Sequence, residues 1–436
     1  MKAPRRKGAG SKSGATDASP PPGLAARRGA LRLLADVLDR GRMLDEGVLG
    51  GRPEERAQAV SLAQTVLRRM GEVDALLASF VEKRPKPPVN HALRMMIAEV
   101  VFADTPDHAA IDMAVRATKA AGAPRMAGLV NAVGRRLTRD GLPDMSGQTN
   151  ANMPMQFRTA LLADWDAETV DRMAASHQMP PPLDLTPRDP AEAERLSADL
   201  GGAVLANGSI RLHAPGQISL LPGFSDGRWW VQDAAASLPA QLLPAMDGLD
   251  VLDLCSAPGG KTMQLASAGA RVTALDASKR RQERVRENLG RTQLDATLVT
   301  ADARSWEPET AFDAILLDAP CSASGTVRRH PDLPHRHSAE SLESLIGLQR
   351  ALLDRAFTWL KPGGTLVYCT CSLFKAEGEG QLAAFLDRTP AARQRTVELP
   401  DLPWAVSEGC LRTRPDHWPD LGGLDGFFAA VIERVS

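Results

Sequence analysis

The chain has 436 residues, of which 43% are hydrophobic and 24% charged, and its formal net charge is −1 at pH 7. This length is enough for about three domains with buried cores, and the balanced charge argues against a protein that coats nucleic acid over its whole surface. The five cysteines, an odd number, favour free thiols in the reducing cytoplasm over a disulfide scaffold. No apolar run has the length that a bilayer requires and no cysteine pair has zinc-knuckle spacing, so we expect neither a membrane segment nor a metal site.

Residues 1–23 are rich in Gly, Ser, Ala and Pro and carry several basic side chains, among them Arg5, Arg6 and Lys7, against one acid, Asp17. Such a segment cannot bury a core, so we predict a disordered tail. It could touch the phosphates of a nucleic acid or be a solvated tail without a specific role. Composition does not separate these two interpretations.

The next part of the chain has apolar residues at helical spacing, for example Leu31, Leu34 and Leu38. We therefore predict a compact helical domain over residues 24–140. The polar stretch that follows, up to about residue 153, is typical of a linker.

Residues 154–248 combine two helical patterns, near residues 157–165 and 191–200, with short extended runs, and predict a small α+β module for RNA binding or linkage. The proline-rich segment 179–186 lies between these helices. Because proline interrupts both helices and inner strands, we expect it to be an extended segment at a sheet edge.

From residue 249 to residue 436 short apolar strands alternate with helices, which predicts a Rossmann-like α/β domain with a parallel sheet between two helical layers. The predicted strands span residues 250–254, 271–276, 296–300, 312–318, 365–369 and 426–434. The predicted helices include residues 278–291, with Ser278 as N-cap, and residues 339–360, which residues 361–364 end.

The sequence DLCSAPGGKT, from Asp253 to Thr262, forms the turn after the first of these strands, where such folds bind a cofactor. Gly259 and Gly260 let the backbone approach a ligand, and the next helix offers free N–H groups to a carboxylate. The turn is not a phosphate-binding P-loop, because Cys255 stands where that motif needs glycine.

Two aspartates follow the next strands. Asp276 closes the second strand, where an acid accepts hydrogen bonds from ribose hydroxyls, and Asp302 follows the third, where it could accept from an adenine amino group. Each alone could be an N-cap or a solvated turn residue. With the turn they predict S-adenosylmethionine, which has an amino acid end, a ribose and an adenine.

Two thiols follow the last two parallel strands: Cys321 in DAPCSASG, which begins at Asp318, and Cys371 in YCTCS. We expect both at the edge of the sheet that holds the cofactor, where a thiolate could add to a pyrimidine ring and activate it for methylation. Spacing does not exclude Cys369, and a buried cysteine is commonly only a small hydrophobic residue.

In their order and spacing these motifs resemble those of the RNA cytosine-5 methyltransferases of the Nop2/Sun family. The leading helical region, with Leu129-Val130-Asn131-Ala132-Val133, is similar to the NusB-type RNA-binding domain that opens the bacterial members. The resemblance implies Cys371 as nucleophile, Cys321 as the residue that assists proton removal and product release, and RNA, above all 16S ribosomal RNA, as substrate of a monomeric enzyme. It assigns to S-adenosylmethionine, or to the edge of the target base, the residues Cys255, Ser256, Ala257, Pro258, Gly259, Gly260, Lys261, Asp276, Asp302 and Asp318.

The sequence departs from the family pattern at two places. Cys369 stands where serine is usual, and Leu333-Pro334-His335 replaces a stretch that usually contains an aromatic residue. The second departure bears on substrate identity more than on chemistry.

Two basic clusters, Arg328-Arg329-His330 and Lys279-Arg280-Arg281, could neutralise RNA phosphates. Two alternatives stay open. The same chemistry could act on tRNA or another RNA, because surface shape selects the target, or the chain could be a non-catalytic RNA-binding factor of ribosome assembly.

Overall fold

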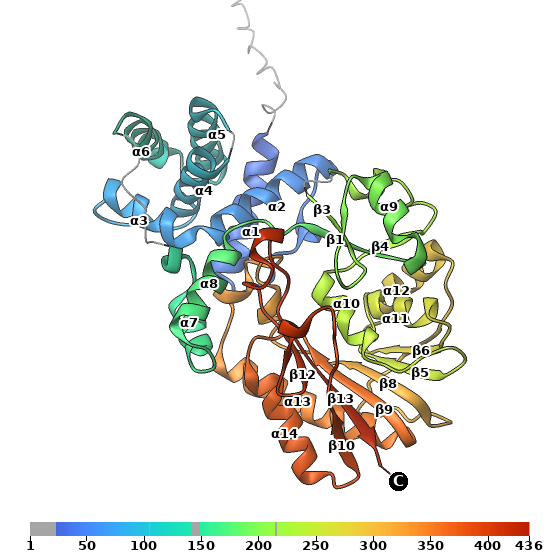
Figure 1. The fold of residues 1–436 in the computed structure, drawn as a ribbon. Coiled ribbons are helices and arrows are strands. Elements are labelled where there is room, and N and C mark those ends of the chain that lie inside the picture. Colours follow the sequence, from blue (N-terminus) through green and yellow to red (C-terminus); the bar gives the residue numbers. More distant parts are fainter. Residues whose placement is uncertain (1–22, 104, 141–148, 214–215, 436) are drawn as a thin grey trace, which may run out of the picture.

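The computed structural model describes residues 23–103, 105–140, 149–213 and 216–435 (Figure 1). The predicted basic tail, except its last residue, and most of the predicted linker lie outside the described residues. Figure 1 shows a helical lobe, a small sheet module and a large α/β part that follow one another along the chain. Within the described residues, no helix is long and apolar enough to cross a membrane.

The described part of residues 24–140 is helical, as the apolar spacing predicts. Its helices are α1 (Leu24–Leu38), α2 (Pro53–Arg68), α3 (Met70–Phe80), α4 (Val89–Phe102), α5 (Asp107–Ala120) and α6 (Ala127–Asp140). Helix α4 packs against the five others and buries most of its residues, with Leu93, Met96 and Ile97 fully inside the core. Burial of so much apolar surface is the main source of stability for this lobe.

Two further helices, α7 (Met155–Leu162) and α8 (Ala167–His177), connect the lobe to the rest of the molecule. Only the first of them is predicted from the sequence. They share a core with Leu373 and Phe374 of the α/β part. The chain enters this region beside α3, where the Asn152 amide bonds the backbone N–H and the carboxylate of Glu72, both at 3.0 Å.

The small module is a four-stranded sheet in the order β2-β3-β1-β4, covered by α9 (Ala193–Leu200). Its strands are β1 (Leu183–Pro187), β2 (Ala203–Val204), β3 (Ile210–Leu212) and β4 (Trp229–Val231). Strand β1 pairs on both sides, so the prediction of an edge position for residues 179–186 is wrong. The prolines at 180–182 precede the strand and Pro187 is its last residue, so residues 183–186 between them keep the N–H groups that the ladders need.

The α/β part is built on one mixed sheet in the order β11-β12-β13-β9-β8-β5-β6-β7, with β10 paired to β13. Five neighbouring strands are parallel: β5 (Asp250–Leu254), β6 (Arg271–Asp276), β7 (Thr297–Thr300), β8 (Phe312–Asp318) and β9 (Leu360–Thr370). Antiparallel strands extend the sheet: β10 (Ala392–Arg395), β11 (Val406–Ser407), β12 (Cys410–Thr413) and β13 (Phe427–Arg434).

Helices cover both faces of this sheet, which confirms the predicted fold class. They are α10 (Ala234–Gln241), α11 (Gly260–Ser267), α12 (Lys279–Thr292), α13 (Ala339–Thr358) and α14 (Glu379–Arg388). Alternate residues of β5 enter two cores: Leu252 and Leu254 join the core beneath α13 and α14, and Val251 the core on the opposite face. Ser278 caps α12 as predicted, since its Oγ accepts from the Arg281 N–H at 3.3 Å.

Strand order reverses at β5, which lies between β6 and β8. In open α/β sheets the crevice at such a switch point, beyond the carboxyl ends of the strands, is where ligands bind. The turn after β5 and the loops after β8 and β9 follow the carboxyl ends of parallel strands and so lie at the same edge of the sheet.

Candidate active site

The turn after β5 is folded tightly against the neighbouring elements. Cys255 has a left-handed backbone (φ 66°), and its N–H donates to the Leu275 carbonyl of β6 at 2.9 Å. Gly259 is also left-handed (φ 102°), and a Cβ there would lie 3.1 Å from Val285 Cγ1. Glycine therefore suits this position, because a side chain there would press against Val285 of α12.

Asp253 lies under this turn with no exposed surface. Thr262 Oγ1 donates to its Oδ2 at 2.5 Å, whereas Oδ1 has no hydrogen-bond partner among the described residues. Burial raises the pKa of this carboxyl to about 7, against hydrogen bonding to Thr262 and the nearby Lys261 charge, which lower it.

Asp276 and Asp302 take different positions at the strand ends. Asp276 is buried and ties the end of β6 to the turn, because its carboxylate accepts from the N–H groups of Ala257 (3.2 Å) and Ser278 (2.9 Å). Asp302 stands at the rim, where hydrogen bonds from the Arg304 side chain and backbone lower its pKa to about 2.

A cavity of about 430 Å³ connects these elements. Its wall is formed by Cys255 and Leu275 from the β5 and β6 ends, Asp302 beyond β7, Pro320 beyond β8, and one face of α13. An elongated ligand can therefore run along the strand ends from the glycine turn to Asp302.

The two predicted thiols meet. Cys321 Sγ and Cys371 Sγ are 3.4 Å apart, and both side chains are half-buried. Strands β8 and β9 are parallel neighbours with Asp318 opposite Cys369, so their loops leave the sheet at the same edge. The hydrogen bond with Cys371 and burial both raise the pKa of the Cys321 thiol well above its ordinary value.

Cys369 differs from this pair because it exposes no surface. Its Sγ lies 3.6 Å from Asp318 Oδ1, and burial raises the pKa of its thiol well above the ordinary value. Asp318 also receives the Lys261 ammonium at 2.8 Å. Burial alone would lower the pKa of Lys261, but the Asp318 carboxylate and the nearby thiols have a larger, opposite effect, and the net pKa is raised. Lys261 is therefore a fixed cation beside the thiols.

The basic cluster Arg328-Arg329 is internal. Arg328 is 1% exposed, and both guanidinium groups pair with the buried carboxylates of Asp233 and Asp425. The prediction that Arg328 neutralises RNA phosphates is therefore wrong, because its charge is used to join α10, the loop after β8 and the start of β13, whereas the Arg329 side chain is 24% exposed. On α12, by contrast, Lys279 and Arg280 are exposed.

Sequence reasoning also missed Glu377, which lies in the turn between β9 and α14 and has no exposed surface. Its carboxylate accepts hydrogen bonds from Ser322 and Ser372, the residues that follow the two thiols. The sequence carried no signal for this role, since a single glutamate in a polar turn normally predicts exposure.

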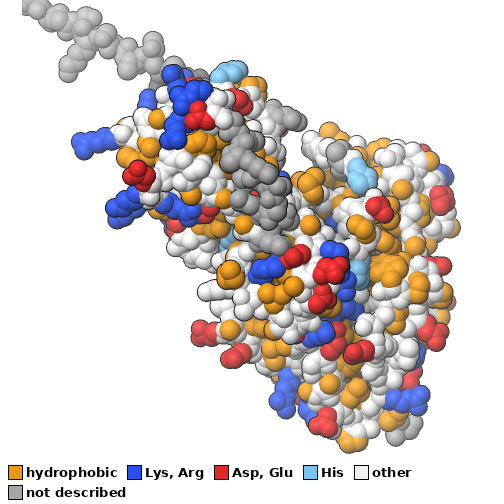
Figure 2. Space-filling view, turned by 60° about the vertical axis from the view of Figure 1, so that its left-hand side comes forward, with side chains coloured by type: hydrophobic (Ala, Val, Ile, Leu, Met, Phe, Trp, Pro, Cys, Tyr) orange, Lys and Arg blue, Asp and Glu red, His pale blue; other side chains and the backbone are white. Residues whose placement is uncertain are grey.

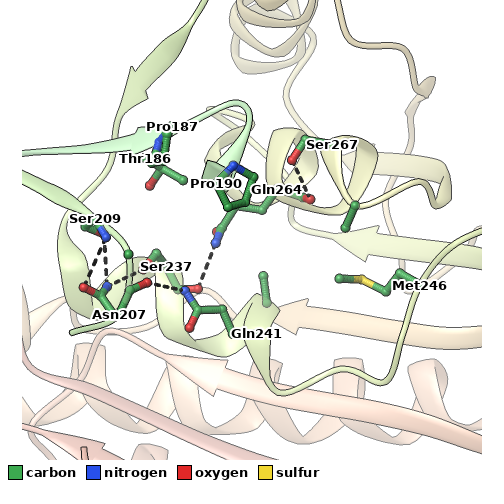
Figure 3. A pocket seen from close by; sticks show the side chains of 13 residues that line it. Thr186, Pro187, Pro190, Asn207, Ser209, Ser237, Gln241, Met246, Gln264 and Ser267 are labelled. Atoms are coloured by element: carbon green, nitrogen blue, oxygen red, sulfur yellow. Dashed lines mark hydrogen bonds between the residues drawn. The ribbon is translucent and has the colours of Figure 1, made fainter. Parts of the chain in front are cut away.

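A second cavity, of about 350 Å³, lies apart from the thiols at the C-terminal end of α11, where the small module meets the α/β part (Figure 3). Asn207 and Gln264 both donate to Ser237 at 2.9 Å along its wall. None of the predicted site residues lines this cavity, and its polar groups bond one another.

The sheet order, the ligand turn after β5 and the thiol pair beyond β8 and β9 together define a Rossmann-like, S-adenosylmethionine-dependent methyltransferase. The family "16S rRNA methyltransferase RsmB/F" matches residues 240–433, and the "NusB family" matches residues 24–139. The chain is 37% identical to the ribosomal RNA small subunit methyltransferase B of Xanthomonas campestris, over 95% of this chain and 98% of that protein. The chain therefore belongs to the RsmB/F family of 16S rRNA methyltransferases.

Other proteins share this similarity. The ribosomal RNA small subunit methyltransferase B of Vibrio vulnificus is 35% identical over 94% of this chain and 99% of that protein. The crystal structure of PH0851 has the same fold, with a TM-score of 0.75, 22% identity and coverage of 95% of this chain and 99% of that chain. A methyltransferase homolog from Pyrococcus horikoshii covers 65% of this chain and 100% of its own, with a TM-score of 0.54 and 25% identity.

Proposed function

We propose that this protein transfers a methyl group from S-adenosylmethionine to carbon 5 of a cytosine in 16S ribosomal RNA, through a covalent bond between Cys371 and the base. The observation that carries the proposal is the 3.4 Å contact between Cys321 Sγ and Cys371 Sγ at the sheet edge that also carries the cofactor turn. The names of the relatives, ribosomal RNA small subunit methyltransferase B, support ribosomal RNA as the substrate.

Carbon 5 of cytosine is too electron-poor to attack a methyl group directly, so a nucleophile must first add at carbon 6. The Cys371 thiolate forms the sulfur–carbon 6 bond, and the electron pair this places on carbon 5 takes the methyl group. Loss of the carbon 5 proton then breaks the sulfur–carbon bond and restores the ring. Cys321 Sγ, 3.4 Å from Cys371 Sγ, is assigned to take up the carbon 5 proton as a thiolate, so that Cys371 can leave.

When bound, S-adenosylmethionine supplies an electrophilic methyl group. We infer that the turn Cys255–Lys261 holds its amino acid end, since the turn follows β5 at the switch point of the sheet and its first residue, Cys255, lines the 430 Å³ cavity. Asp276 and Asp302 are assigned to its ribose and adenine, because Asp302 lines the 430 Å³ cavity and Asp276 lies between two residues that line it, Leu275 and Ala277. Asp318, paired with Lys261, is assigned to the edge of the target base.

RNA needs a positively charged surface, and the helical lobe offers one. Exposed basic side chains follow α3 and lie on α6: Lys83, Arg84, Lys86, Arg135, Arg136 and Arg139. The two groups are neighbours, since Arg136 Nη1 donates to the Phe80 carbonyl at the end of α3 at 3.2 Å. Figure 2 shows Lys and Arg side chains projecting from this lobe. We name these six residues the basic surface and propose that it binds RNA to a monomeric enzyme in the cytoplasm.

Bisulfite sequencing of total RNA tests the proposal. A strain that lacks the gene is complemented with the wild type or with Cys371→Ala, and we expect one 16S cytosine to lose its protection and regain it only with the wild type. An unchanged 16S pattern combined with a changed tRNA site would move the substrate to tRNA. No change at any cytosine would leave the non-catalytic assembly factor as the better account.

A further inference from the structure

A fully buried carboxylate lies directly behind the thiol pair. Glu377 Oε2 accepts from the hydroxyls of Ser322 and Ser372, each at 2.5 Å. Its Oε1 accepts from the backbone N–H of Ser322 at 2.9 Å and from Gln349 Nε2 of α13 at 2.8 Å. One side chain therefore gathers four hydrogen bonds from three separate elements.

The donors belong to the loops that carry the thiols. Ser322 directly follows Cys321, and Ser372 directly follows Cys371. Ser324 closes the network, since its Oγ lies 3.1 Å from the Oγ atoms of both other serines. The distance between the two sulfur atoms thus depends on two loops that meet at one carboxylate.

Packing alone does not explain a charged group at this position. Within the described residues Glu377 forms no ion pair, and a buried carboxylate without a counter-ion is unfavourable unless its hydrogen bonds compensate. Four good donors do so here, and the charge of the carboxylate also acts on the Cys321 thiol. The hydrogen bond with Cys371, burial and the charge of Glu377 all raise the pKa of the Cys321 thiol.

We propose that Glu377 is a positioning residue of the thiol pair, which holds the loops after β8 and β9 together so that Cys321 and Cys371 meet. Its catalytic consequence rests on the proposed function. The position of the sulfur atoms, however, is measurable without RNA or cofactor, so the two ideas can fail separately.

The first measurement is the rate of disulfide formation between Cys321 and Cys371. The diazene oxidant diamide takes up the two hydrogens that the thiols lose, and mass spectrometry of digested protein counts the linked peptides. Glu377→Gln keeps the shape but replaces an acceptor oxygen with an amide, and Glu377→Asp keeps the charge but shortens the reach. We expect Glu377→Asp, which keeps the charge that raises the pKa of Cys321, to form the disulfide several-fold more slowly, whereas Asp387→Asn, an exposed acid on α14, forms it at the wild-type rate.

The second measurement is turnover on RNA, where we expect kcat to fall roughly 10- to 100-fold in both Glu377 variants while the KM for RNA stays constant. A wild-type oxidation rate in Glu377→Asp would overturn the proposal, whatever its activity. Slower oxidation in a protein whose wild type methylates no RNA would support the positioning role and defeat the proposed function. If the Glu377 variants do not fold, Ser372→Ala removes one of the four hydrogen bonds and is expected to shift both rates in the same direction.

Discussion

Cys321 Sγ and Cys371 Sγ lie 3.4 Å apart, although fifty positions of sequence separate the two residues. The parallel pairing of β8 with β9 brings them together, because both thiols follow the carboxyl end of their strand. Their environments differ from that of Cys369, which is buried two residues before Cys371. Burial therefore separates Cys369, which the spacing in the sequence did not exclude, from the half-buried pair Cys321 and Cys371.

Replacement of Cys371 by alanine is expected to abolish methyl transfer, because Cys371 is assigned to form the bond to carbon 6 and Cys321, the other half-buried thiol of the pair, is assigned to proton removal. Cys369→Ser, which introduces the residue usual in the family that the sequence resembles, is the matched control and should keep activity within a few-fold of wild type. Transfer of tritiated methyl groups to unmodified 16S RNA measures both variants. Activity that survives in Cys371→Ala and disappears in Cys369→Ser would reverse the assignment.

Replacement of Cys321 by alanine is expected to permit the first bond to RNA but to stall release, because the group that assists proton removal is gone. The product should be a protein–RNA adduct that withstands denaturation and migrates as a slower band on a gel. The band should vanish in the double variant Cys321→Ala/Cys371→Ala, which lacks the attacking sulfur. Normal turnover without an adduct would remove Cys321 from the mechanism.

The large-scale fold could be predicted from sequence because its signals are local. Apolar runs fixed the positions of β5, β6 and β8 to the residue, since these central strands are buried on both faces. The small module was harder, because its strands have only two to five residues each. Residues 183–187 lie inside that sheet because they pair with segments that are distant in the sequence. The nearby prolines, on which the prediction of an edge position was based, carry no information about this pairing.

The site could be predicted only in part, for a similar reason. The thiols and the glycine turn lie next to strands, so strand ends placed them. Arg328 looked like a surface charge because its partners Asp233 and Asp425 are 95 and 97 positions away. Glu377 was missed because its burial depends on loops that fold over it from two strands.

The buried arginine leads to a prediction about stability. Arg328→Ala leaves two buried carboxylates with one cation fewer, and the loss of one partner in such a cluster costs about 3–5 kcal/mol. Arg116→Ala is the control, because its ion pair with Asp112 on α5 is half-exposed and contributes about 0.3–0.5 kcal/mol. Urea unfolding followed by tryptophan fluorescence should show a much lower midpoint only for Arg328→Ala. Equal midpoints would mean that the cluster does not stabilise the α/β part.

Asp253 leads to a prediction about pH. Its folded-state pKa of about 7 lies above the ordinary value of 3.8, so its contribution to stability is complete below pH 4 and is lost as the pH rises through 7. The side chain at position 253 in the variant Asp253→Asn cannot ionise, so the variant does not lose stability as the pH rises. Measured without cofactor, the melting temperature of Asp253→Asn relative to that of wild type should therefore be higher at pH 8 than at pH 5. Asp302→Asn is the control, since the pKa of Asp302 is about 2 and its ionisation does not change in this range. If the melting temperatures of Asp253→Asn and wild type differ by the same amount at both pH values, Asp253 is not a buried carboxyl that titrates in this range.

The basic surface leads to a prediction about RNA affinity that separates two candidate surfaces. Changing Lys83, Lys86 and Arg135 to alanine removes three exposed charges for which no ion pair occurs within the described residues. We expect this variant to bind RNA more weakly. Its plot of log affinity against log salt concentration should also be less steep, by about one for each lost phosphate contact. The comparison variant, Lys279→Ala/Arg280→Ala on α12, should bind like wild type. If the α12 variant alone loses affinity and salt dependence, RNA crosses the α/β part at α12, and the helical lobe has another role.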